Sequence, residues 1–451
     1  MHKTDNQVIL YEQNPWWRSS KVDKPFLGDF KREVFDDLVR ELLKKEITVL
    51  FGPRRSGKTT LLYELVNYLI EKKNVDPKRI LFLNFDNFWL KKTLLRDSLN
   101  VFLEILGESL VDLSAPIYIF LDEIHLLSKW SSQVKEIFDL KKNIKIYVSG
   151  SSGYKIIKGG GESLIGRSNY FRIMPFSFFE RINALNPRLR LPSRLNFDNH
   201  LREFLPMTNE YNKALRDYFF FGGFPEVLNK SREEVFEIIK TYKSLILQRD
   251  ILEMKKITEP MILSDLFALI ADRVSSKISI TNLASDLGIK FDTARKYLTY
   301  MEEANLIRLV KPFSHKKTRS LRKERKLYLI DNAFSAANIL SFDLEKAIPS
   351  LAENSVFIER VGKISPFDEE IYYGASKNFS EIDFIFLEKK NWVVEVKWQE
   401  RINSEDEKYV WEFSKMNPRF KPLLITKKDL DFSSKVPKIP LFLYLLLKKE
   451  E

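Results

Sequence analysis

Eight residues near the start of the chain have the types and the spacing of a loop that binds phosphate groups. Residues 52–59 read Gly-Pro-Arg-Arg-Ser-Gly-Lys-Thr, which fits the pattern GxxxxGK followed by Ser or Thr. The glycines let the backbone fold tightly, so that its amide N–H groups face the phosphates of a nucleotide. The loop precedes a helical segment, whose N-terminus adds positive potential. We therefore expect Lys58 to reach the β- and γ-phosphates of ATP and Thr59 to hold Mg²⁺.

Two acidic residues follow the apolar run 117–121, which reads Ile-Tyr-Ile-Phe-Leu. In open α/β sheets, ligands bind beyond the carboxyl ends of the strands. We expect Asp122 to bind Mg²⁺, directly or through water, and Glu123 to polarise the attacking water. Asp122 lies 64 residues after Lys58 (122 − 58), with one further strand between them. This placement is typical of a Walker B motif.

These side chains need a sheet whose strands end at one edge, and the first third of the chain has the pattern for it. Short apolar runs alternate with segments of helical period, as expected for a parallel sheet covered by helices on both faces. The runs are 47–51, 80–85, 117–121, 144–149 and 170–174, and the helical segments lie near 58–73, 94–110 and 130–140. The predicted fold class is α/β.

Seven motifs occur in a fixed order along the chain. They are Asn14-Pro-Trp-Trp17, the loop 52–59, Leu121-Asp-Glu-Ile-His125, Trp130, Val148-Ser-Gly-Ser-Ser152, Glu162-Ser-Leu-Ile-Gly-Arg167 and Met174-Pro-Phe-Ser-Phe-Phe-Glu180. The set resembles a prokaryotic, largely archaeal and bacterial, family of AAA+-type P-loop ATPases. In that family the ATPase is fused to a C-terminal winged helix and a restriction-endonuclease-like domain. The resemblance covers nearly the whole chain and implies ATP hydrolysis more firmly than any biological task.

Two further positions could take part in hydrolysis. In AAA+ ATPases a small polar residue at the strand end after the Walker B acids senses the γ-phosphate or the lytic water, and Ser149 or Ser151 could do so here. Arg167 could stabilise charge in the transition state, from its own subunit or from a neighbour's, and its presence leads us to expect a homo-oligomer. The residues expected to bind the nucleotide are Gly52, Pro53, Arg54, Arg55, Ser56, Gly57, Lys58, Thr59, Thr60, Asp122 and Ser149.

Residues 278–304 have the spacing of a helix-turn-helix. A helix capped at Thr281 is expected to end in a turn at Gly288, and a second helix is expected to begin at Phe291. The second helix is the one that would enter a DNA major groove. Behind it, residues 311–326 contain eight basic residues and one acid, and such a wing could straddle phosphates. We expect DNA as a partner, and protein packing is the alternative use of this module.

A hairpin near the C-terminus carries acidic residues that could hold a second metal ion. Asp383 and Glu395-x-Lys397 resemble the PD-(D/E)XK nuclease signature, and Glu353 matches the helical Glu that often precedes it. If the loop is residues 388–390, Asp383 lies opposite Glu395, whereas a two-residue loop would put them on opposite faces. The two carboxylates could hold Mg²⁺ or Mn²⁺, and Lys397 would position the hydroxide. A cross-strand ion pair with no catalytic role is the alternative explanation of Glu395-x-Lys397.

The amino-acid composition excludes several kinds of chemical site. The 451 residues include no Cys, which excludes disulfides, thiolate catalysis and Cys-ligated metal sites. The net charge of +12 (74 basic minus 62 acidic) fits a polyanionic partner. No apolar stretch reaches the roughly 20 residues of a membrane span, so we expect no membrane association and a cytoplasmic location.

The expected parts of the chain are an N-terminal segment (1–24), an AAA+ core (25–180), a helical lid (181–260), a winged helix-turn-helix (261–335) and a nuclease-like domain (345–451).

The leading hypothesis is an ATPase that hydrolyses ATP with Mg²⁺ and is coupled to DNA binding and to metal-dependent DNA cleavage. The alternative is a regulatory nucleotide switch that binds DNA or protein partners and has a silent nuclease fold. A third reading, a scaffold that binds ATP without turnover, is opposed by Glu123. The residues expected to be catalytic are Lys58, Glu123, Arg167, Asp383, Glu395 and Lys397, and the expected metal ligands are Thr59, Asp122, Asp383 and Glu395.

Overall fold

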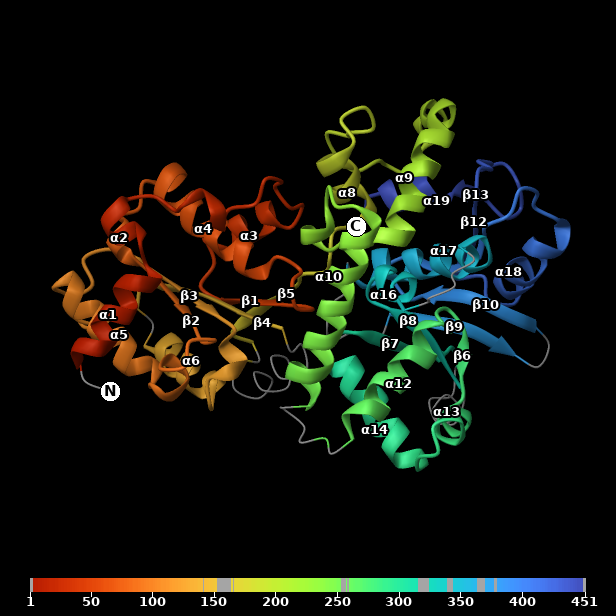
Figure 1. Ribbon diagram of the computed structural model, residues 1–451. Helices are drawn as coiled ribbons and strands as arrows, with labels where there is room; N and C mark the ends of the chain where they lie inside the picture. The colour runs from red at the N-terminus through yellow and green to blue at the C-terminus, as the bar shows by residue number, and fades with distance from the viewer. Residues whose placement is uncertain are drawn as a thin grey trace. The chain divides into compact units, whose positions relative to one another are not determined.

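The chain divides into two units, Met1–Ile173 (unit 1) and Met174–Glu451 (unit 2). The computed structural model describes residues 3–140, 142–151, 164, 166–252, 257, 259–314, 324–338, 344–362, 370–376 and 379–448. In Figure 1, unit 1 runs from red to yellow and unit 2 from yellow-green to blue. Each unit has a hydrophobic core of its own.

Unit 1 is built on a five-stranded parallel sheet with the strand order β2-β3-β4-β1-β5. All five predicted apolar runs form its strands: β1 (Ile47–Phe51), β2 (Ile80–Asn84), β3 (Ile117–Asp122), β4 (Ile144–Gly150) and β5 (Ser168–Arg172). Their near-continuous burial is typical of a parallel sheet covered on both faces. The predicted α/β class with a parallel sheet is confirmed. Since β1 lies between β4 and β5, the chain reverses its direction of winding beside β1, where ligands of such sheets bind.

Helices cover both faces of this sheet, with α3 and α4 on one face and α1, α5 and α6 on the other (Figure 1). The predicted segment 58–73 is the helix α4, residue for residue. The helices are α1 (Lys3–Gln13), α2 (Trp16–Ser19), α3 (Phe35–Glu41), α4 (Lys58–Lys73), α5 (Leu95–Leu106) and α6 (Trp130–Asp139). Short 3₁₀ turns are η1 (Lys24–Phe26), η2 (Pro77–Arg79), η3 (Leu90–Lys92) and η4 (Ile124–Leu126).

The N-terminal motif Asn-Pro-Trp-Trp covers the edge strand β2 with side chains. Asn14 accepts a hydrogen bond from the N–H of Phe82 at 2.7 Å and donates to its carbonyl oxygen at 3.0 Å. The indole N–H of Trp17 donates to the carbonyl oxygen of Ile80 at 2.8 Å. An exposed edge strand offers unpaired backbone groups to other chains, and these contacts occupy them. The motif therefore completes the sheet that carries the predicted nucleotide site.

Unit 2 is built on a mixed eight-stranded sheet with the order β13-β12-β11-β10-β9-β7-β8-β6. Strand β10 is antiparallel to both of its neighbours, and β11, β12 and β13 are parallel. The strands are β6 (Lys277–Ile278), β7 (Ile307–Pro312), β8 (Arg325–Leu329), β9 (Ile371–Ser376), β10 (Phe379–Phe386), β11 (Asn391–Lys397), β12 (Phe420–Thr426) and β13 (Lys438–Pro440). A short parallel pairing of β7 with β9 joins the first three strands to the other five.

The helices of unit 2 share one core with this sheet, and a smaller core lies beneath α18. The α-helices are α8 (Phe178–Leu185), α9 (Thr208–Phe221), α10 (Arg232–Leu245), α12 (Pro260–Ala271), α13 (Ile280–Asp286), α14 (Phe291–Glu303), α16 (Ala333–Ala336), α17 (Leu344–Val361), α18 (Ser404–Met416) and α19 (Leu441–Leu446). The 3₁₀ turns η5 (Asn199–Met207) and η6 (Pro225–Val227) and the π-helical turn η7 (Ile246–Leu252) complete the unit. None of the described helices has the length and the apolar character that crossing a membrane requires.

The predicted helix-turn-helix has the expected helices but a different cap. Helix α14 begins at Phe291, and Gly288 has the left-handed φ of +64° that the turn requires. The expected cap at Thr281 is wrong, because the hydroxyl of Ser279 accepts the hydrogen bond from Asn282 N–H at 3.3 Å. The centre of the predicted basic wing, residues 315–323, lies outside the described residues.

Candidate nucleotide site and candidate carboxylate site

The loop 52–59 joins β1 to α4 in a conformation that depends on its glycines. At Gly52, a Cβ would lie 2.1 Å from the carbonyl oxygen of Ile173, so only glycine fits. Gly57 has a φ of +93° and is the N-cap of α4, and Arg55 also has a left-handed φ, of +64°. The N-terminus of α4 therefore begins directly at the loop, as a phosphate-binding site requires.

The ammonium group of Lys58 lies within this loop. Its Nζ donates to the carbonyl oxygens of Gly52 at 3.0 Å and of Pro53 at 2.7 Å, and the side chain is buried. The hydroxyl of Ser56 donates to the same carbonyl of Pro53 at 3.0 Å, and Arg32 donates to the carbonyl oxygen of Ser56 at 2.8 Å. The loop thus holds a positive charge where the phosphates are predicted to lie.

Asp122 ends β3 and accepts hydrogen bonds from neutral groups on three other segments. Thr59 Oγ1 donates to Asp122 Oδ2 at 2.8 Å, Asn84 Nδ2 donates to the same oxygen at 3.2 Å, and the hydroxyl of Ser149 donates to Oδ1. Burial, and then the neighbouring charge of Glu123, raise the pKa of Asp122 to about 6. The structure thus brings together the predicted residues from the loop and from the ends of β3 and β4.

Glu123 follows in a left-handed conformation, with a φ of +50°, which turns the chain after β3. Its Oε2 accepts from the backbone N–H of Ser151 at 3.3 Å and lies 3.3 Å from Nδ1 of His125. Burial opposes ionisation of this carboxyl, but the charges of Lys58, His125 and Arg54 outweigh it and lower the pKa of Glu123. Glu123 is therefore ionised at neutral pH and has a defined orientation.

The donor set at this site fits Mg²⁺ and ATP. A hydroxyl and a carboxylate are oxygen ligands of the kind that Mg²⁺ prefers, and Thr59 and Asp122 place them 2.8 Å apart. Thr60 follows Thr59 in the first turn of α4 and is half-buried. We therefore regard Thr59 and Asp122 as the residues that would hold the metal ion.

Arg167 lies away from the nucleotide site, whereas Asn84, which belongs to none of the predicted motifs, is part of it. Arg167 precedes β5 at its amino end, where its backbone carbonyl accepts from Ile47 N–H, and its side chain pairs with Asp139 at 3.1 Å. The loop lies at the opposite end of these strands, so the chain does not bring its own Arg167 to the nucleotide site. Asn84 was missed, although a polar residue at the carboxyl end of a strand was the available signal.

The C-terminal hairpin has the register that the three-residue loop predicts. Phe384 pairs with Val394 and Phe386 with Trp392, and this register places Asp383 opposite Glu395. The N–H of Asp383 donates to Glu395 Oε2 at 3.2 Å. The structure thus brings these two predicted carboxylates together. Lys397 Nζ lies 2.8 Å from Glu395 Oε1, so these residues form an ion pair within β11 and not across two strands.

A second cation, Lys326 of β8, lies among the carboxylates. Its Nζ is 2.8 Å from Asp383 Oδ1, 2.8 Å from Glu353 Oε1 and 2.7 Å from Glu381 Oε1. Burial lowers the pKa of Lys326, but the charge of Asp383 and of the other acids outweighs it, and the pKa lies well above its usual value. Burial, and then the charge of Asp383, raise the pKa of Glu395 to about 8.

These residues do not fit a resident divalent metal ion, because an ammonium group takes the oxygens that would bind it. In the described part of the chain, no group of three or more His, Asp or Glu side chains is arranged to hold a metal ion. Lys326 was counted only as one of the basic residues of the wing. Its position in the apolar strand Lys-Leu-Tyr-Leu-Ile was the signal that it is buried.

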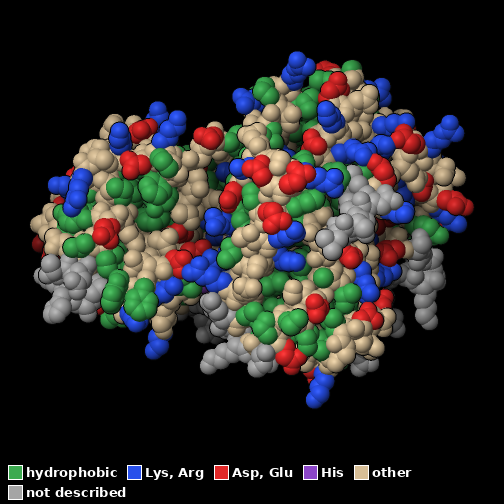
Figure 2. Space-filling view, in the orientation of Figure 1, with side chains coloured by type: hydrophobic (Ala, Val, Ile, Leu, Met, Phe, Trp, Pro, Cys, Tyr) green, Lys and Arg blue, Asp and Glu red, His purple; other side chains and the backbone are tan. Residues whose placement is uncertain are grey.

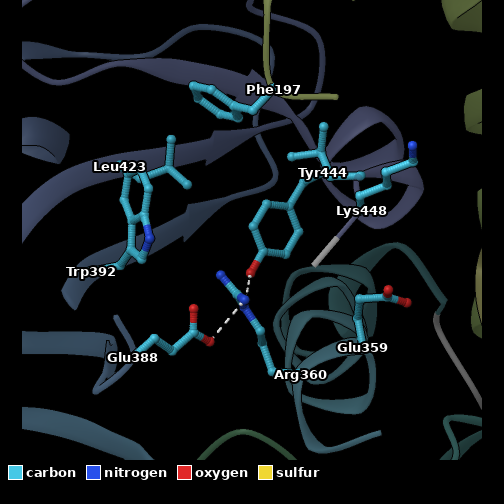
Figure 3. Close-up of a pocket in the computed structure, with 9 residues that line it drawn as sticks. Phe197, Glu359, Arg360, Glu388, Trp392, Leu423, Tyr444 and Lys448 are labelled. Atoms are coloured by element: carbon cyan, nitrogen blue, oxygen red, sulfur yellow. Dashed lines mark hydrogen bonds and ion pairs between the residues drawn. The ribbon is translucent and has the colours of Figure 1, made fainter. Parts of the chain in front are cut away.

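A separate pocket in unit 2 is lined by aromatic side chains and by Arg360 (Figure 3). Arg360 Nε donates to the hydroxyl of Tyr444 at 2.7 Å, and its Nη1 donates to Glu388 Oε1 at 2.9 Å. Trp392 and Phe197 form part of the wall. Since the guanidinium already has two partners that fix it, this pocket is best explained as a structural contact between α17, α19 and the hairpin.

Comparisons with known proteins agree with the P-loop geometry. Residues 44–182 match the model of an AAA domain, and residues 212–344 and 350–444 match models of two domains of unknown function. The uncharacterized protein MJ1544 of Methanocaldococcus jannaschii is 30% identical over 399 residues, which cover 84% of this chain and 83% of that protein. An uncharacterized protein of Haemophilus influenzae is 27% identical over 347 residues, 75% of this chain and 79% of that protein.

Among solved structures, the Walker-type ATPase PABY2304 of Pyrococcus abyssi is similar at a TM-score of 0.43 and 15% identity, over 70% of this chain and 97% of that one. The AAA match assigns residues 44–182 to a P-loop ATPase domain that binds ATP. The expected AAA-type core is thereby confirmed, and the comparisons give no function to the rest of the chain.

Proposed function

The chain belongs to the family of the uncharacterized protein MJ1544 of Methanocaldococcus jannaschii, and from this premise we propose that it is a nucleotide switch. It hydrolyses ATP with Mg²⁺ in unit 1, and the nucleotide state controls binding of DNA by unit 2. The P-loop ATPase domain of residues 44–182 supports the ATPase part of this proposal.

The observation that carries the proposal is the hydrogen bond of 2.8 Å between Thr59 and Asp122. It joins the phosphate-binding loop to the end of β3. It also places a hydroxyl beside a carboxylate, and these are the two kinds of ligand that hold Mg²⁺ in P-loop NTPases. When bound there, Mg²⁺ would neutralise charge on the β- and γ-phosphates.

The other residues of unit 1 have separable roles in this reaction. The backbone N–H groups of the loop, which Pro53 lacks, would face the phosphates, and Lys58 would turn from the loop carbonyls toward the γ-phosphate. Glu123, held by the N–H of Ser151, would orient the attacking water and accept its proton. Its lowered pKa supports this role, because only the ionised carboxylate can accept a proton.

Phosphate release by the full chain with ATP and Mg²⁺ tests the proposal. We expect Glu123→Gln to lower kcat by about 100-fold or more, while a fluorescent ATP analogue still binds. Glu136→Gln is the matched control, because Glu136 is exposed on α6. If wild type and Glu123→Gln release phosphate at the same rate, the scaffold that binds ATP without turnover becomes the better description.

For unit 2 we propose the finer architecture that the sequence predicted. Residues 181–260 form a lid, 261–335 a winged helix-turn-helix and 345–451 a restriction-endonuclease-like domain. The helix pair α13–α14 followed by the antiparallel strands β7 and β8 supports the winged helix. The β10–β11 hairpin followed by α18 and the parallel strand β12 supports the endonuclease-like fold. Both modules share one sheet, so a change in one would reach the other.

The proposed DNA contact lies on α14. Its core face is Ala294, Leu298 and Met301, which are buried, whereas Arg295 and Lys296 are exposed. Over the face in Figure 2, basic and acidic side chains are mixed, so the net charge of +12 does not form one patch there. A local contact by this helix therefore supports DNA binding better than the overall charge does.

Fluorescence anisotropy with a duplex DNA, at several salt concentrations, tests this contact. We expect Arg295→Ala/Lys296→Ala to weaken binding about 10-fold or more and to reduce the salt slope by roughly 1 per lost phosphate contact. Lys230→Ala/Lys240→Ala on and before α10 is the matched control, because these lysines are also exposed. Equal loss in both double variants would mean that only net charge matters.

Metal-dependent DNA cleavage by Asp383, Glu395 and Lys397 is the competing proposal. Their proximity favours it, and the buried cation Lys326 opposes it. Circular, linear and single-stranded DNA with Mg²⁺ or Mn²⁺, with and without ATP, separates the two. Cutting that disappears in Asp383→Ala would establish a working nuclease, whereas intact DNA under all conditions supports the switch.

A homo-oligomer in which Arg167 acts on a neighbour's nucleotide is a further part of the proposal. It is motivated by the position of Arg167 at the strand ends that lie away from its own loop. Mixing Arg167→Ala protein with Lys58→Ala protein should restore part of the ATPase rate. Absence of complementation would remove the support for a role between subunits.

A further inference from the structure

The strongest unexplained feature of unit 2 is the ammonium group of Lys326. It contacts three carboxylates from two elements, Glu353 of α17 and Glu381 and Asp383 of β10, at 2.7 to 2.8 Å. An ammonium has three hydrogens to donate, so these contacts use its full capacity. The side chain is 2% exposed, which makes the group a buried charge with a complete set of partners.

Each of the three carboxylates also has a second partner within the chain. Lys277 lies 2.7 Å from Glu381 Oε2, and the backbone N–H of Val396 donates to Asp383 Oδ2 at 2.9 Å. The hydroxyl of Tyr328 donates to Glu353 Oε1 at 2.6 Å. Each of these three carboxylates therefore has its charge balanced or its oxygens hydrogen-bonded within the chain.

A divalent ion would need the same oxygens. Mg²⁺ binds at about 2.0–2.1 Å in octahedral geometry and usually keeps several waters. Such an ion cannot share the space with an ammonium that already lies within hydrogen-bond distance of three carboxylates. The two cations would also repel each other strongly at this depth, where screening by water is weak.

We propose that Lys326 is the built-in cation of this nuclease-like site, and that it takes the place of the divalent metal and makes the cluster a structural cross-link. Lys326 comes from β8, and its partners come from β10 and α17. The cross-link therefore ties the hairpin β7–β8 to the domain that carries the PD-(D/E)XK-like residues. This inference is independent of ATP hydrolysis in unit 1.

The role of Asp383 separates this proposal from an ordinary metal site. In a metal site that has lost its ion, neighbouring carboxylates repel, and neutralising one of them stabilises the protein. With Lys326 as the cation, neutralising Asp383 removes an attraction and destabilises it.

The experiment uses the full chain without nucleotide and compares wild type, Lys326→Met, Asp383→Asn and the double variant. Lys230→Met, on the surface, is the matched control. Thermal unfolding is measured with and without Mn²⁺, and Mn²⁺ binding is measured by electron paramagnetic resonance. We expect Lys326→Met and Asp383→Asn each to lower the Tm by roughly 6 °C or more, and Lys230→Met to change it by about 1 °C.

Mn²⁺ should raise the Tm of Lys326→Met, because the carboxylates then accept a metal ion, but not that of wild type or of the double variant. Wild-type binding of Mn²⁺ that disappears in Asp383→Asn would overturn the proposal. So would an increase in Tm on going from wild type to Asp383→Asn. If Lys326→Met does not fold, the sign of the Tm change in Asp383→Asn still decides.

Discussion

The acidic sites of unit 1 and unit 2 are built from similar parts, but their lysines are placed differently. In unit 1, Asp122 accepts hydrogen bonds from two hydroxyls and an amide, and Lys58 donates to loop carbonyls. In unit 2, Asp383 accepts directly from the ammonium of Lys326. Neutral donors orient a carboxylate and leave its charge available for a cation from solution. An ammonium group in direct contact compensates that charge, so a carboxylate that is paired with a lysine is not by itself a metal site.

Because of this difference, the same substitution of a buried aspartate has different effects in the two units. A buried ion pair is costly to break, because the partner left behind is an uncompensated charge. Neutralising a carboxylate that is held by hydroxyls leaves no ammonium without its partner, so the protein loses less stability. We therefore expect substitutions in unit 1 to change function and equivalent substitutions in unit 2 to change stability.

The largest expected effect is the contrast between Asp122→Asn and Asp383→Asn. We expect Asp122→Asn to weaken binding of Mg²⁺-ATP by about 10- to 100-fold and to leave the unfolding of unit 2 unchanged. We expect Asp383→Asn to leave nucleotide binding unchanged and to destabilise unit 2 by about 3 kcal/mol. Calorimetric titration and thermal unfolding measure both. A loss of nucleotide affinity in Asp383→Asn would mean that the sites are not separable.

A smaller effect distinguishes the two candidate serines. Ser149 donates its hydroxyl to Asp122, whereas Ser151 contacts Glu123 through its backbone N–H. We therefore expect Ser149→Ala to lower kcat by about 10-fold, the equivalent of one hydrogen bond to a charged group. Ser151→Ala keeps the backbone contact, so its kcat should stay within about 2-fold of wild type. Steady-state phosphate release measures both, and a larger loss in Ser151→Ala would reverse the assignment.

The smallest effect concerns Glu64 of α4, a half-buried carboxylate that has no hydrogen bond from a hydroxyl or an ammonium group among the described residues. Its Oε1 accepts from Gly28 N–H at 3.3 Å, and burial raises the pKa of Glu64 to about 7. The folded state thus binds this proton more tightly than the unfolded state, whose pKa is near 4.5. The stability from this group is complete at low pH and is lost as the pH rises from about 4.5 to 7.

Glu64→Gln should therefore have a Tm close to that of wild type at pH 5 and a Tm higher by a few degrees at pH 8. Glu71→Gln is the control, because Glu71 lies exposed near the end of the same helix. Thermal unfolding of unit 1 between pH 5 and pH 8 measures the trend. A difference that shrinks as the pH rises would contradict the assignment of the raised pKa.

The elements that the sequence predicted well are those with a local cause. The helix 58–73 and all five strands of unit 1 follow from apolar period and from the glycine-rich loop, which act over a few residues. The register of the β10–β11 hairpin was left open between a two-residue and a three-residue loop, and the structure has the three-residue register that the nuclease-like chemistry favoured. The cap at Thr281 was wrong, because Ser279, two residues earlier, has the same kind of side chain and accepts the hydrogen bond from the first turn of α13.

The sequence by itself therefore determined the phosphate-binding loop, the α/β class and the acids at the strand ends, since spacing along the chain places them. Only the tertiary structure decided which cation each acid meets. Lys326 lies 57 residues before Asp383, and its place at the start of an apolar strand indicates burial but not which acids it contacts. Strand pairing and the packing of α17 bring it into the carboxylate cluster, and contacts between distant segments have no signature in local sequence.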